Sequence, residues 1–145
     1  MSLPVPRPGL VICYAYLWAE EQRLGREEGV KNRPCAIIAA RQVIDGREIV
    51  TVLPITHSPP SQKTPAIELP PVIKVHLGLD AAPSWIMLTE TNDFLWPGPD
   101  LFLVPGVSPP RFHFGMLPPR FYAHVRDRVL EVSKERRQNR IWRNE

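Results

Sequence analysis

Proline is the residue that most limits how this chain can fold. The sequence holds 18 prolines in 145 residues, more than twice the usual share of about 5%. Proline cannot donate a hydrogen bond to a sheet ladder, and it interrupts helices. A chain this rich in proline therefore favours short strands and turns.

The bulk composition is typical of a globular protein in water. Apolar residues make up 43% of the chain and charged residues 23%, and the length predicts a single domain over residues 1–145 with frayed ends. No stretch approaches the ~18 uncharged apolar residues of a membrane helix, and the N-terminus lacks the apolar core of a signal peptide. We therefore expect a cytoplasmic protein with no membrane partner.

The two cysteines do not predict a metal site. Cys13 and Cys35 both fall inside expected strands, where a thiol behaves as a small hydrophobic group. They lack partner histidines at the spacing of a zinc site and are too few for a disulfide framework. We expect buried thiols, no bound metal and no cofactor.

The net charge of +3 permits a polyanionic partner without requiring one. Five basic residues gather in the stretch KERRQNRIWRNE, residues 134–145. This stretch is predicted to be the exposed end of a helix. A solvated helix face is its simplest interpretation, and contact with nucleic acid is the alternative.

Apolar runs separated by turn signals predict a mainly β fold. The expected strands cover residues 9–18, 34–40, 49–56, 64–70 and 84–91. The turn signal Asp45-Gly46 joins the second and third strands into a hairpin, and Pro54 predicts an edge or a bulge in the third. Residues 18–33 carry two glycines and no apolar stripe, so a mobile loop is favoured over a short helical turn.

Two helices complete the expected fold. Residues 71–78 begin with proline and stop at Gly78, as a short helix does. From Pro118 to about residue 138, apolar residues recur every three to four positions, which predicts an amphipathic helix packed on the sheet; they are Phe121, Val125, Val129 and Val132. The stretch 97–112 is turn-rich and irregular. The expected architecture is a small barrel with helices.

Polar side chains stand at two strand ends. Arg33 opens the strand that runs into the apolar stretch CAII, and Thr56-His57-Ser58 closes the following strand before two prolines. Polar chemistry at the end of a buried strand needs an explanation, and a binding or catalytic site supplies one.

The order of these motifs resembles that of the MazF/PemK family of toxin endoribonucleases. The family has a glycine-rich first loop, an Arg-Pro that opens the second strand, and a PIT or similar motif that ends the third. The corresponding elements here are the loop 25–29, Arg33-Pro34 and Pro54-Ile55-Thr56. A later strand ending in an acid, here Glu90, and a C-terminal helix also fit, so the resemblance spans about residues 9–135.

The resemblance implies a fold and an activity. It implies an SH3-like β-barrel with a C-terminal α-helix, in a homodimer that cleaves single-stranded RNA without metal. It also implies an antitoxin protein that neutralises the enzyme. Carried over to this sequence, Arg33 and Thr56 become the catalytic pair.

The chemistry of metal-free RNA cleavage predicts a role for a third residue. The attacking 2′-hydroxyl needs a base, and the phosphoryl oxygens need a cation. Arg33 suits the cation, because its planar guanidinium binds phosphate in a fork and remains charged. Thr56 can orient a hydroxyl but does not readily accept a proton. His57 can serve as the base, since histidine exchanges protons near neutral pH; a loop histidine beside the site is the alternative.

The remaining candidate site residues are predicted to contact RNA. Aromatic faces serve as stacking platforms for single strands, so Trp18 is one candidate. Arg26 and Lys31 add cations from the first loop, and Ser58 either contacts RNA or caps the turn before Pro59. Glu90 is a candidate for direct chemistry, with a structural hydrogen bond as the alternative.

A non-enzymatic function competes with the nuclease. The same barrel could bind RNA without cleaving it, or inhibit a protein target such as a topoisomerase. Arg33 and Thr56 at adjoining strand ends favour the enzyme. Leu88 favours the binder, because some family members have an arginine two residues before the strand's acid.

Overall fold

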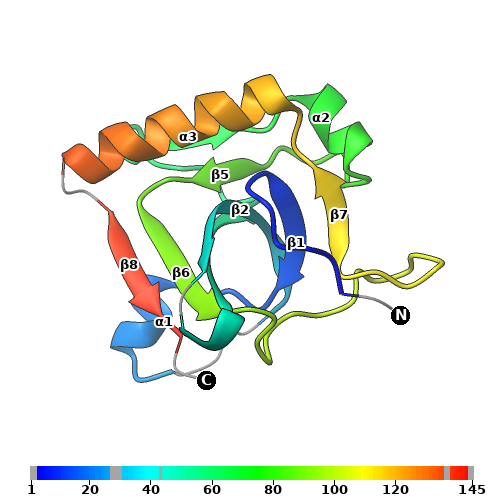
Figure 1. Ribbon diagram of the computed structural model, residues 1–145. Coiled ribbons are helices and arrows are strands. Elements are labelled where there is room, and N and C mark those ends of the chain that lie inside the picture. The colour runs from blue at the N-terminus through cyan, green and yellow to red at the C-terminus, as the bar shows by residue number, and fades with distance from the viewer. Residues whose placement is uncertain (1–2, 27–30, 43, 136–137, 144–145) are drawn as a thin grey trace.

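The computed structural model describes residues 3–26, 31–42, 44–135 and 138–143 as a mainly antiparallel β fold with short helices (Figure 1). Its elements, in chain order, are β1 (Leu10–Tyr14), α1 (Ala19–Arg23), β2 (Arg33–Gln42), η1 (Ile44–Gly46), β3 (Glu48–Thr56), β4 (Ala66–Glu68), α2 (Pro71–His76), β5 (Trp85–Met87), β6 (Glu90–Leu95), β7 (His113–Met116), α3 (Pro119–Lys134) and β8 (Asn139–Trp142). None of the described helices is long and apolar enough to cross a membrane.

The strands form one strongly bent sheet. Its main path runs β4-β5-β3-β2-β1-β7, and β6 joins it by pairing with β3 while β8 pairs with β6. The pairings among the described strands do not link β4 back to β7, so the sheet is open. The predicted mainly β class with helices is confirmed, whereas closure into an SH3-like barrel stays a prediction.

Two apolar cores lie on opposite faces of β1, β2 and β3. Because successive side chains of a strand point to opposite faces, Ile12, Ile37 and Val52 join one core, around Phe94. Their neighbours Val11 and Leu53 join the other, which α2 and α3 cover. All five residues of β1 are buried in consequence.

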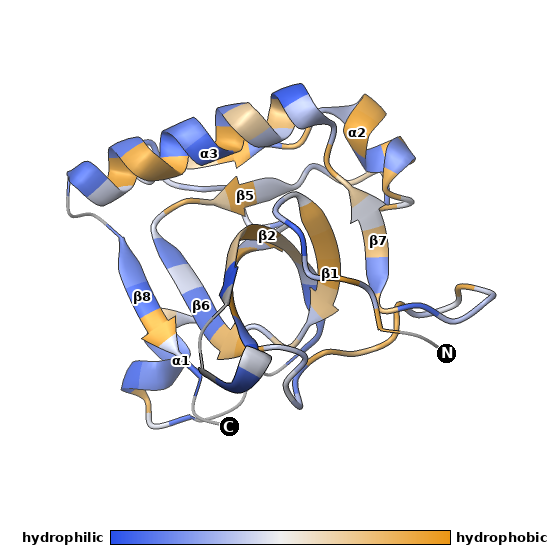
Figure 2. Cartoon of the chain, in the orientation of Figure 1, coloured by the Kyte–Doolittle hydropathy of each residue, from blue (hydrophilic) through white to orange (hydrophobic). Residues whose placement is uncertain are grey.

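The helix α3 covers the second core with one face. Val125, Val129 and Val132 are buried, and Phe121 packs against the same cluster. Figure 2 shows hydrophobic and hydrophilic segments alternating along this helix. The predicted amphipathic helix is therefore confirmed, although it ends at Lys134 rather than near residue 138.

The predicted hairpin is also present. β2 and β3 pair antiparallel, and the turn between them holds Asp45 at φ 57° and Gly46 at φ 73°, the left-handed conformation that Asp-Gly accommodates. β4 and α2 lie inside the ranges predicted for them, with proline in the first turn of α2.

The strand β3 changes partner near Pro54. Residues 49–52 pair with β6, and Ile55 and Thr56 pair with β5. Leu53 and Pro54 lie between these two partners, so the missing amide hydrogen of Pro54 falls where the ladder is interrupted. The edge predicted from Pro54 is thus a local one.

Two sequence predictions need correction in the sheet. The expected strand 84–91 is two strands, β5 and β6, and the second continues to Leu95. The strand β7 was not predicted, because His113–Met116 is a short run after a proline-rich stretch. Cys13 and Cys35 are buried free thiols, as expected.

The favoured loop at residues 18–33 is also wrong in part, because it contains the helix α1. This helix buries no residue of its own. The apolar stripe is therefore absent, as the sequence indicates, but its absence does not prevent a helix. Its first turn is stabilised by hydrogen bonds instead. The Trp18 N–H donates to Glu21 Oε1 at 3.0 Å and the Ala19 N–H donates to Glu90 Oε1 at 2.9 Å, which satisfies amides that a helix start leaves free.

The basic C-terminal stretch is not the end of a helix. After α3 the chain forms β8, parallel to β6, and two of its arginines make ion pairs. Arg140 pairs with Asp93 at 3.0 Å, and the buried Arg143 pairs with Asp100 at 2.7 Å. Arg143 also donates to the Ala15 carbonyl and to Asn92 Oδ1. Arg136 and Arg137 lie outside the described residues.

Replacing Arg143 by Ala should lower the free energy of unfolding by about 3 kcal/mol, because it leaves the partners of a buried guanidinium without their donor. Arg140→Ala, three residues earlier in β8, is the matched control. The Arg140 side chain is 51% exposed against 2% for Arg143, so its loss should cost at most about 1 kcal/mol. Urea unfolding of both variants measures the difference, and equal losses would contradict this account.

Candidate functional site

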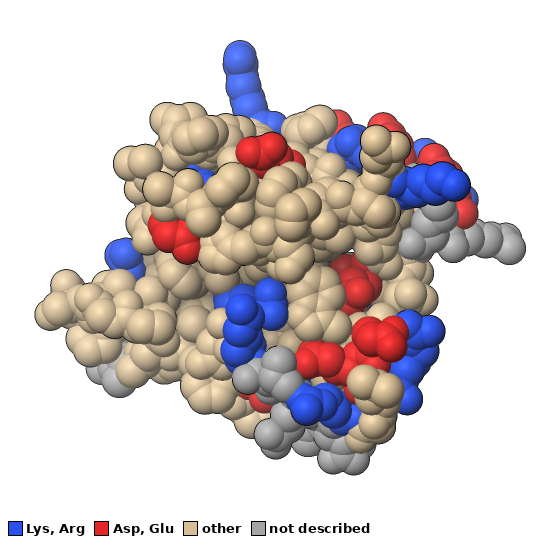
Figure 3. Space-filling view, turned by 180° about the vertical axis from the view of Figure 1, so that it is seen from behind, with Lys and Arg blue, Asp and Glu red and all other residues tan. Residues whose placement is uncertain are grey.

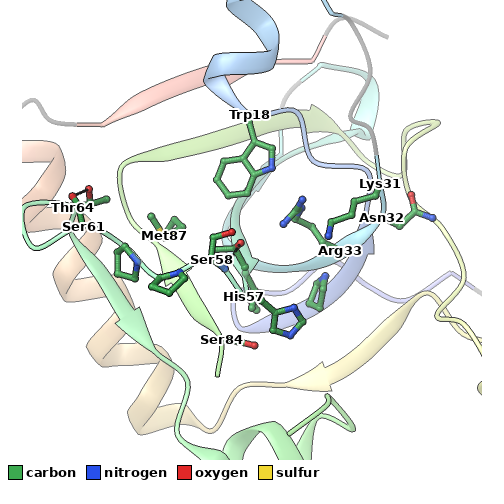
Figure 4. Close-up of a pocket in the computed structure, with 15 residues that line it drawn as sticks. Trp18, Lys31, Asn32, Arg33, His57, Ser58, Ser61, Thr64, Ser84 and Met87 are labelled. Atoms are coloured by element: carbon green, nitrogen blue, oxygen red, sulfur yellow. Dashed lines mark hydrogen bonds between the residues drawn. The ribbon is translucent and has the colours of Figure 1, made fainter. Parts of the chain in front are cut away.

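The polar residues at the two strand ends meet in one surface cavity. β2 and β3 are antiparallel with Cys35 opposite Pro54, and extending that register by two residues puts Arg33 across from Thr56. The cavity at this edge has a volume of about 570 Å³. Six predicted site residues line it, namely Trp18, Lys31, Arg33, Thr56, His57 and Ser58 (Figure 4).

Arg33 is held against an aromatic ring. Its guanidinium carbon lies 4.9 Å from the centre of the Trp18 ring, a cation–π distance. The Arg33 Nε is buried and has no hydrogen-bond partner among the described residues. Leaving such a donor unpaired costs about 1–3 kcal/mol. An acceptor bound in the cavity could remove that cost.

Trp18 is positioned from its far side by Glu90. The Trp18 ring meets Tyr16 edge to face with 5.1 Å between ring centres. Glu90 Oε1 accepts hydrogen bonds from the Tyr16 hydroxyl at 3.2 Å and from the Ala19 N–H next to Trp18. Glu90 itself does not line the cavity. Its observed contacts are structural hydrogen bonds, which was the alternative to a direct chemical role.

Burial raises the pKa of the Glu90 carboxyl, although the hydrogen bonds from the Ala19 amide and the Tyr16 hydroxyl act in the opposite direction. The carboxylate is half-buried beneath α1. Its function in this position is to connect β6 with the first turn of that helix and with the aromatic pair that supports Arg33.

Thr56 presents a hydroxyl whose oxygen is already engaged. The side chain is buried, and its Oγ1 accepts the Ser58 N–H at 3.1 Å. This turn carries the chain away from the end of β3. Because the hydroxyl hydrogen has no acceptor within the part of the chain that the structure describes, Thr56 can donate it to a ligand.

His57 follows Thr56 and also lines the cavity, which it does because β3 ends between them. Its Nε2 lies 3.0 Å from the carboxylate of Asp80, in the loop after α2. Asp80 also accepts a hydrogen bond from the buried Lys74 Nζ at 2.9 Å. These bonds, the one from Lys74 first, hold the pKa of Asp80 below its usual range.

The charged side chains among the described lining residues of the cavity are of one sign. Lys31 and Arg33 line it, and none of the described lining residues carries a carboxylate. Acidic side chains lie elsewhere. Figure 3 shows acidic and basic side chains mixed at the lower right of that view, where α1 and β8 lie. At this corner Glu20 pairs with Arg23, and Glu21 pairs with Arg26 at 3.9 Å.

The structure separates the predicted RNA contacts into two groups. Trp18, Lys31 and Ser58 lie at the cavity, whereas Arg26 is paired with Glu21 on α1 and does not line it. Leu88 is fully buried in the core under α3. The expected glycine-rich loop cannot be placed in full, because residues 27–30 lie outside the described residues.

Several lining residues were not predicted. Uncharged polar side chains complete the walls, namely Asn32, Ser61, Thr64 and Ser84. Ser61 and Thr64 hydrogen-bond each other at 2.6 Å. Asp80, which holds His57, was missed as well. No spacing in the sequence joins it to His57, since the contact depends on how the loop after α2 folds back.

Comparison of the chain with protein-family models, curated proteins and solved structures gives no match. Among the described residues, no three or more histidines, cysteines, aspartates or glutamates gather where they could hold a metal ion.

Replacing Glu90 by Gln should stabilise the protein more at pH 7 than at pH 4. Because the folded-state pKa of Glu90 is raised, its ionisation lowers stability once the pH exceeds the unfolded-state value of about 4.3. That loss is complete above the folded-state pKa and absent below the unfolded-state one. Gln keeps an oxygen for the Ala19 amide without the charge.

Urea unfolding at both pH values measures the change, with the exposed Glu68→Gln on β4 as the control. An equal effect of Glu90→Gln at the two pH values would show that burial of its charge does not affect stability.

Proposed function

We propose that this chain is an endoribonuclease that cleaves single-stranded RNA in the cavity between the ends of β2 and β3, without a metal ion. One observation carries the proposal. Arg33 is fixed by Trp18 across from Thr56 and beside His57, and its buried Nε has no acceptor among the described residues. A phosphate group supplies acceptors of the geometry that a guanidinium fork fits.

The residues of the cavity match the needs of phosphodiester cleavage. His57 takes the proton of the 2′-hydroxyl as its oxygen bonds to phosphorus, and the bond from phosphorus to the 5′ oxygen breaks. The leaving oxygen takes a proton from water, and the product is a 2′,3′-cyclic phosphate. Arg33 stabilises the charge on the phosphoryl oxygens, and Thr56 donates its hydroxyl hydrogen to one of them.

The substrate class follows from the same groups. The 2′-hydroxyl is the nucleophile, so the proposed reaction needs RNA. An open cavity lined by Asn32, Ser84 and the aromatic Trp18 suits an unpaired strand, whose bases can be hydrogen-bonded and stacked. Lys31 adds a second cation for the backbone.

The order of the motifs supports a wider proposal. It resembles that of the MazF/PemK toxins, and it supports an SH3-like barrel, a homodimer, growth inhibition in the cytoplasm and release of that inhibition by an antitoxin protein. These points depend on the resemblance, whereas the cleavage chemistry depends on the cavity.

The second candidate function is RNA binding without cleavage. The exposure of His57 favours it, because the side chain is 56% exposed and a general base is usually more shielded from water than this. The cations and the aromatic ring would serve such a binder equally well. Cleavage assays separate the two functions.

Purified protein should cleave single-stranded RNA in excess chelator and leave a cyclic phosphate, because Arg33 and Lys31 supply the positive charge in the cavity. Arg33→Ala should reduce the rate about 10²-fold or more, as the loss of a transition-state donor does. Arg33→Lys should restore only part of it, since an ammonium lacks the fork.

Arg41→Ala, an exposed arginine near the other end of β2, is the matched control and should retain full activity. A fluorogenic oligonucleotide of mixed sequence reports the rates. Full activity in folded Arg33→Ala would rule out this site. Tight RNA binding without cleavage under any condition would favour the binding function.

A further inference from the structure

The loop after α2 carries Asp80, whose carboxylate is held by the buried Lys74. Lys74 Nζ is buried and donates to Asp80 Oδ1 at 2.9 Å, to Ser84 Oγ at 2.7 Å and to the Ala82 carbonyl. The Ala82 N–H donates to the same Asp80 oxygen at 3.2 Å. All three protons of the ammonium are thereby used, which makes Lys74 an anchor for this loop.

The carboxylate determines which ring nitrogen of His57 carries a proton. Two hydrogen bonds to Asp80, from Lys74 and from His57, favour its ionised form, and an ionised carboxylate only accepts hydrogen bonds. His57 Nε2 lies 3.0 Å from it, so Nε2 must be the donor. In the neutral ring the other nitrogen, Nδ1, is then the acceptor.

We propose that Asp80 is a positioning residue that holds His57 as the Nε2–H tautomer, and that Nδ1 is the atom that accepts the proton of the RNA 2′-hydroxyl. The role of Nδ1 rests on the proposed nuclease function, whereas the tautomer does not. Asp80 acts through His57, and Lys74 keeps Asp80 in place.

The charges around His57 explain why such a partner is needed. The imidazolium that forms after proton transfer shares the cavity with Lys31 and Arg33, and both cations oppose it. The carboxylate of Asp80 contacts the ring and opposes them, and part of its own charge is balanced by Lys74. The proton then leaves Nδ1 for solvent, which restores the neutral tautomer.

The tautomer can be measured without RNA. Long-range nitrogen–proton NMR of the full chain labelled with ¹⁵N-histidine distinguishes the two nitrogens of each ring. In the wild type at a pH where His57 is neutral, Nε2 should carry the proton. Asp80→Asn should produce a mixture of tautomers, because an amide can either donate or accept. Asp127→Asn, an exposed aspartate on α3, is the control and should change nothing.

A His57 that carries its proton on Nδ1 in the wild type would overturn the proposal, and so would unchanged tautomers in folded Asp80→Asn. The wild-type measurement decides the tautomer even if Asp80→Asn fails to fold.

The cleavage assay tests the second half. Asp80→Asn should lower kcat about 10-fold or more while KM changes little, because a misoriented base acts after the substrate has bound. Asp80→Glu should recover part of the rate.

The two proposals fail in different ways. The expected tautomer without RNA cleavage would reject the nuclease and keep the positioning role of Asp80. Cleavage that is unaffected by Asp80→Asn would keep the nuclease and reject Asp80 as a positioning residue.

Discussion

The antiparallel register of β2 and β3 determines both the cores and the cavity. Cys35 lies opposite Pro54, and the side chains of both strands are divided between the two cores: Cys35, Ile37, Val50 and Val52 face the core around Phe94, while Ala36, Leu53 and Ile55 face the core under α3. The same register brings the start of β2 to the end of β3. Because both faces of these strands are buried, a slip of one residue would move side chains into the other core and disturb the packing of both. Core packing therefore fixes the placement of Arg33 across from Thr56. The geometry of the cavity therefore depends on core residues along both strands as well as on the residues that line it.

Contacts with residues outside the cavity then orient the side chains of Arg33 and His57. Arg33 lies against Trp18, Trp18 is held by Tyr16 and α1, and Glu90 binds both of these from β6. His57 is oriented in the same indirect way by Asp80, which a buried lysine anchors. In both cases a carboxylate outside the cavity lining acts through a neighbouring side chain that lines it. Among the residues that the structure describes, this arrangement keeps carboxylates out of the cavity lining, where an anionic ligand would lie, and still uses them to restrict the side chains that would bind it.

Much of the fold could be predicted from local patterns, and the errors have physical causes. The hairpin, α2 and α3 were predictable because proline, Asp-Gly and a three-to-four-residue apolar period act within a few residues. α1 was missed because Glu90, 71 residues away along the chain, satisfies its first amide. β8 was missed because the charge of its neighbour Arg143 predicts an exposed segment. The partners that bury Arg143, Asp100 and Asn92, are distant in sequence. The site divides in the same way. Arg33, Thr56 and His57 stood out as polar residues at strand ends, but the pairing of His57 with Asp80 has no local signal.

The change of pairing partner at Pro54 of β3 connects the fold of the sheet with the construction of the site. If β3 paired with one strand along its whole length on this side, the sheet would not divide there. Instead, β6 pairs with the first part of β3 and β5 with its last two residues, with Leu53 and Pro54 between them. The change of partner lets β5 diverge from β6, and the two strands contribute to different parts of the site: Met87 of β5 and the adjoining Ser84 line the cavity, whereas Glu90 of β6 supports Trp18 from behind. Pro54, which cannot donate a hydrogen bond to a ladder, thus lies where the sheet divides into β5, which lines the cavity, and β6, which supports Trp18 behind it.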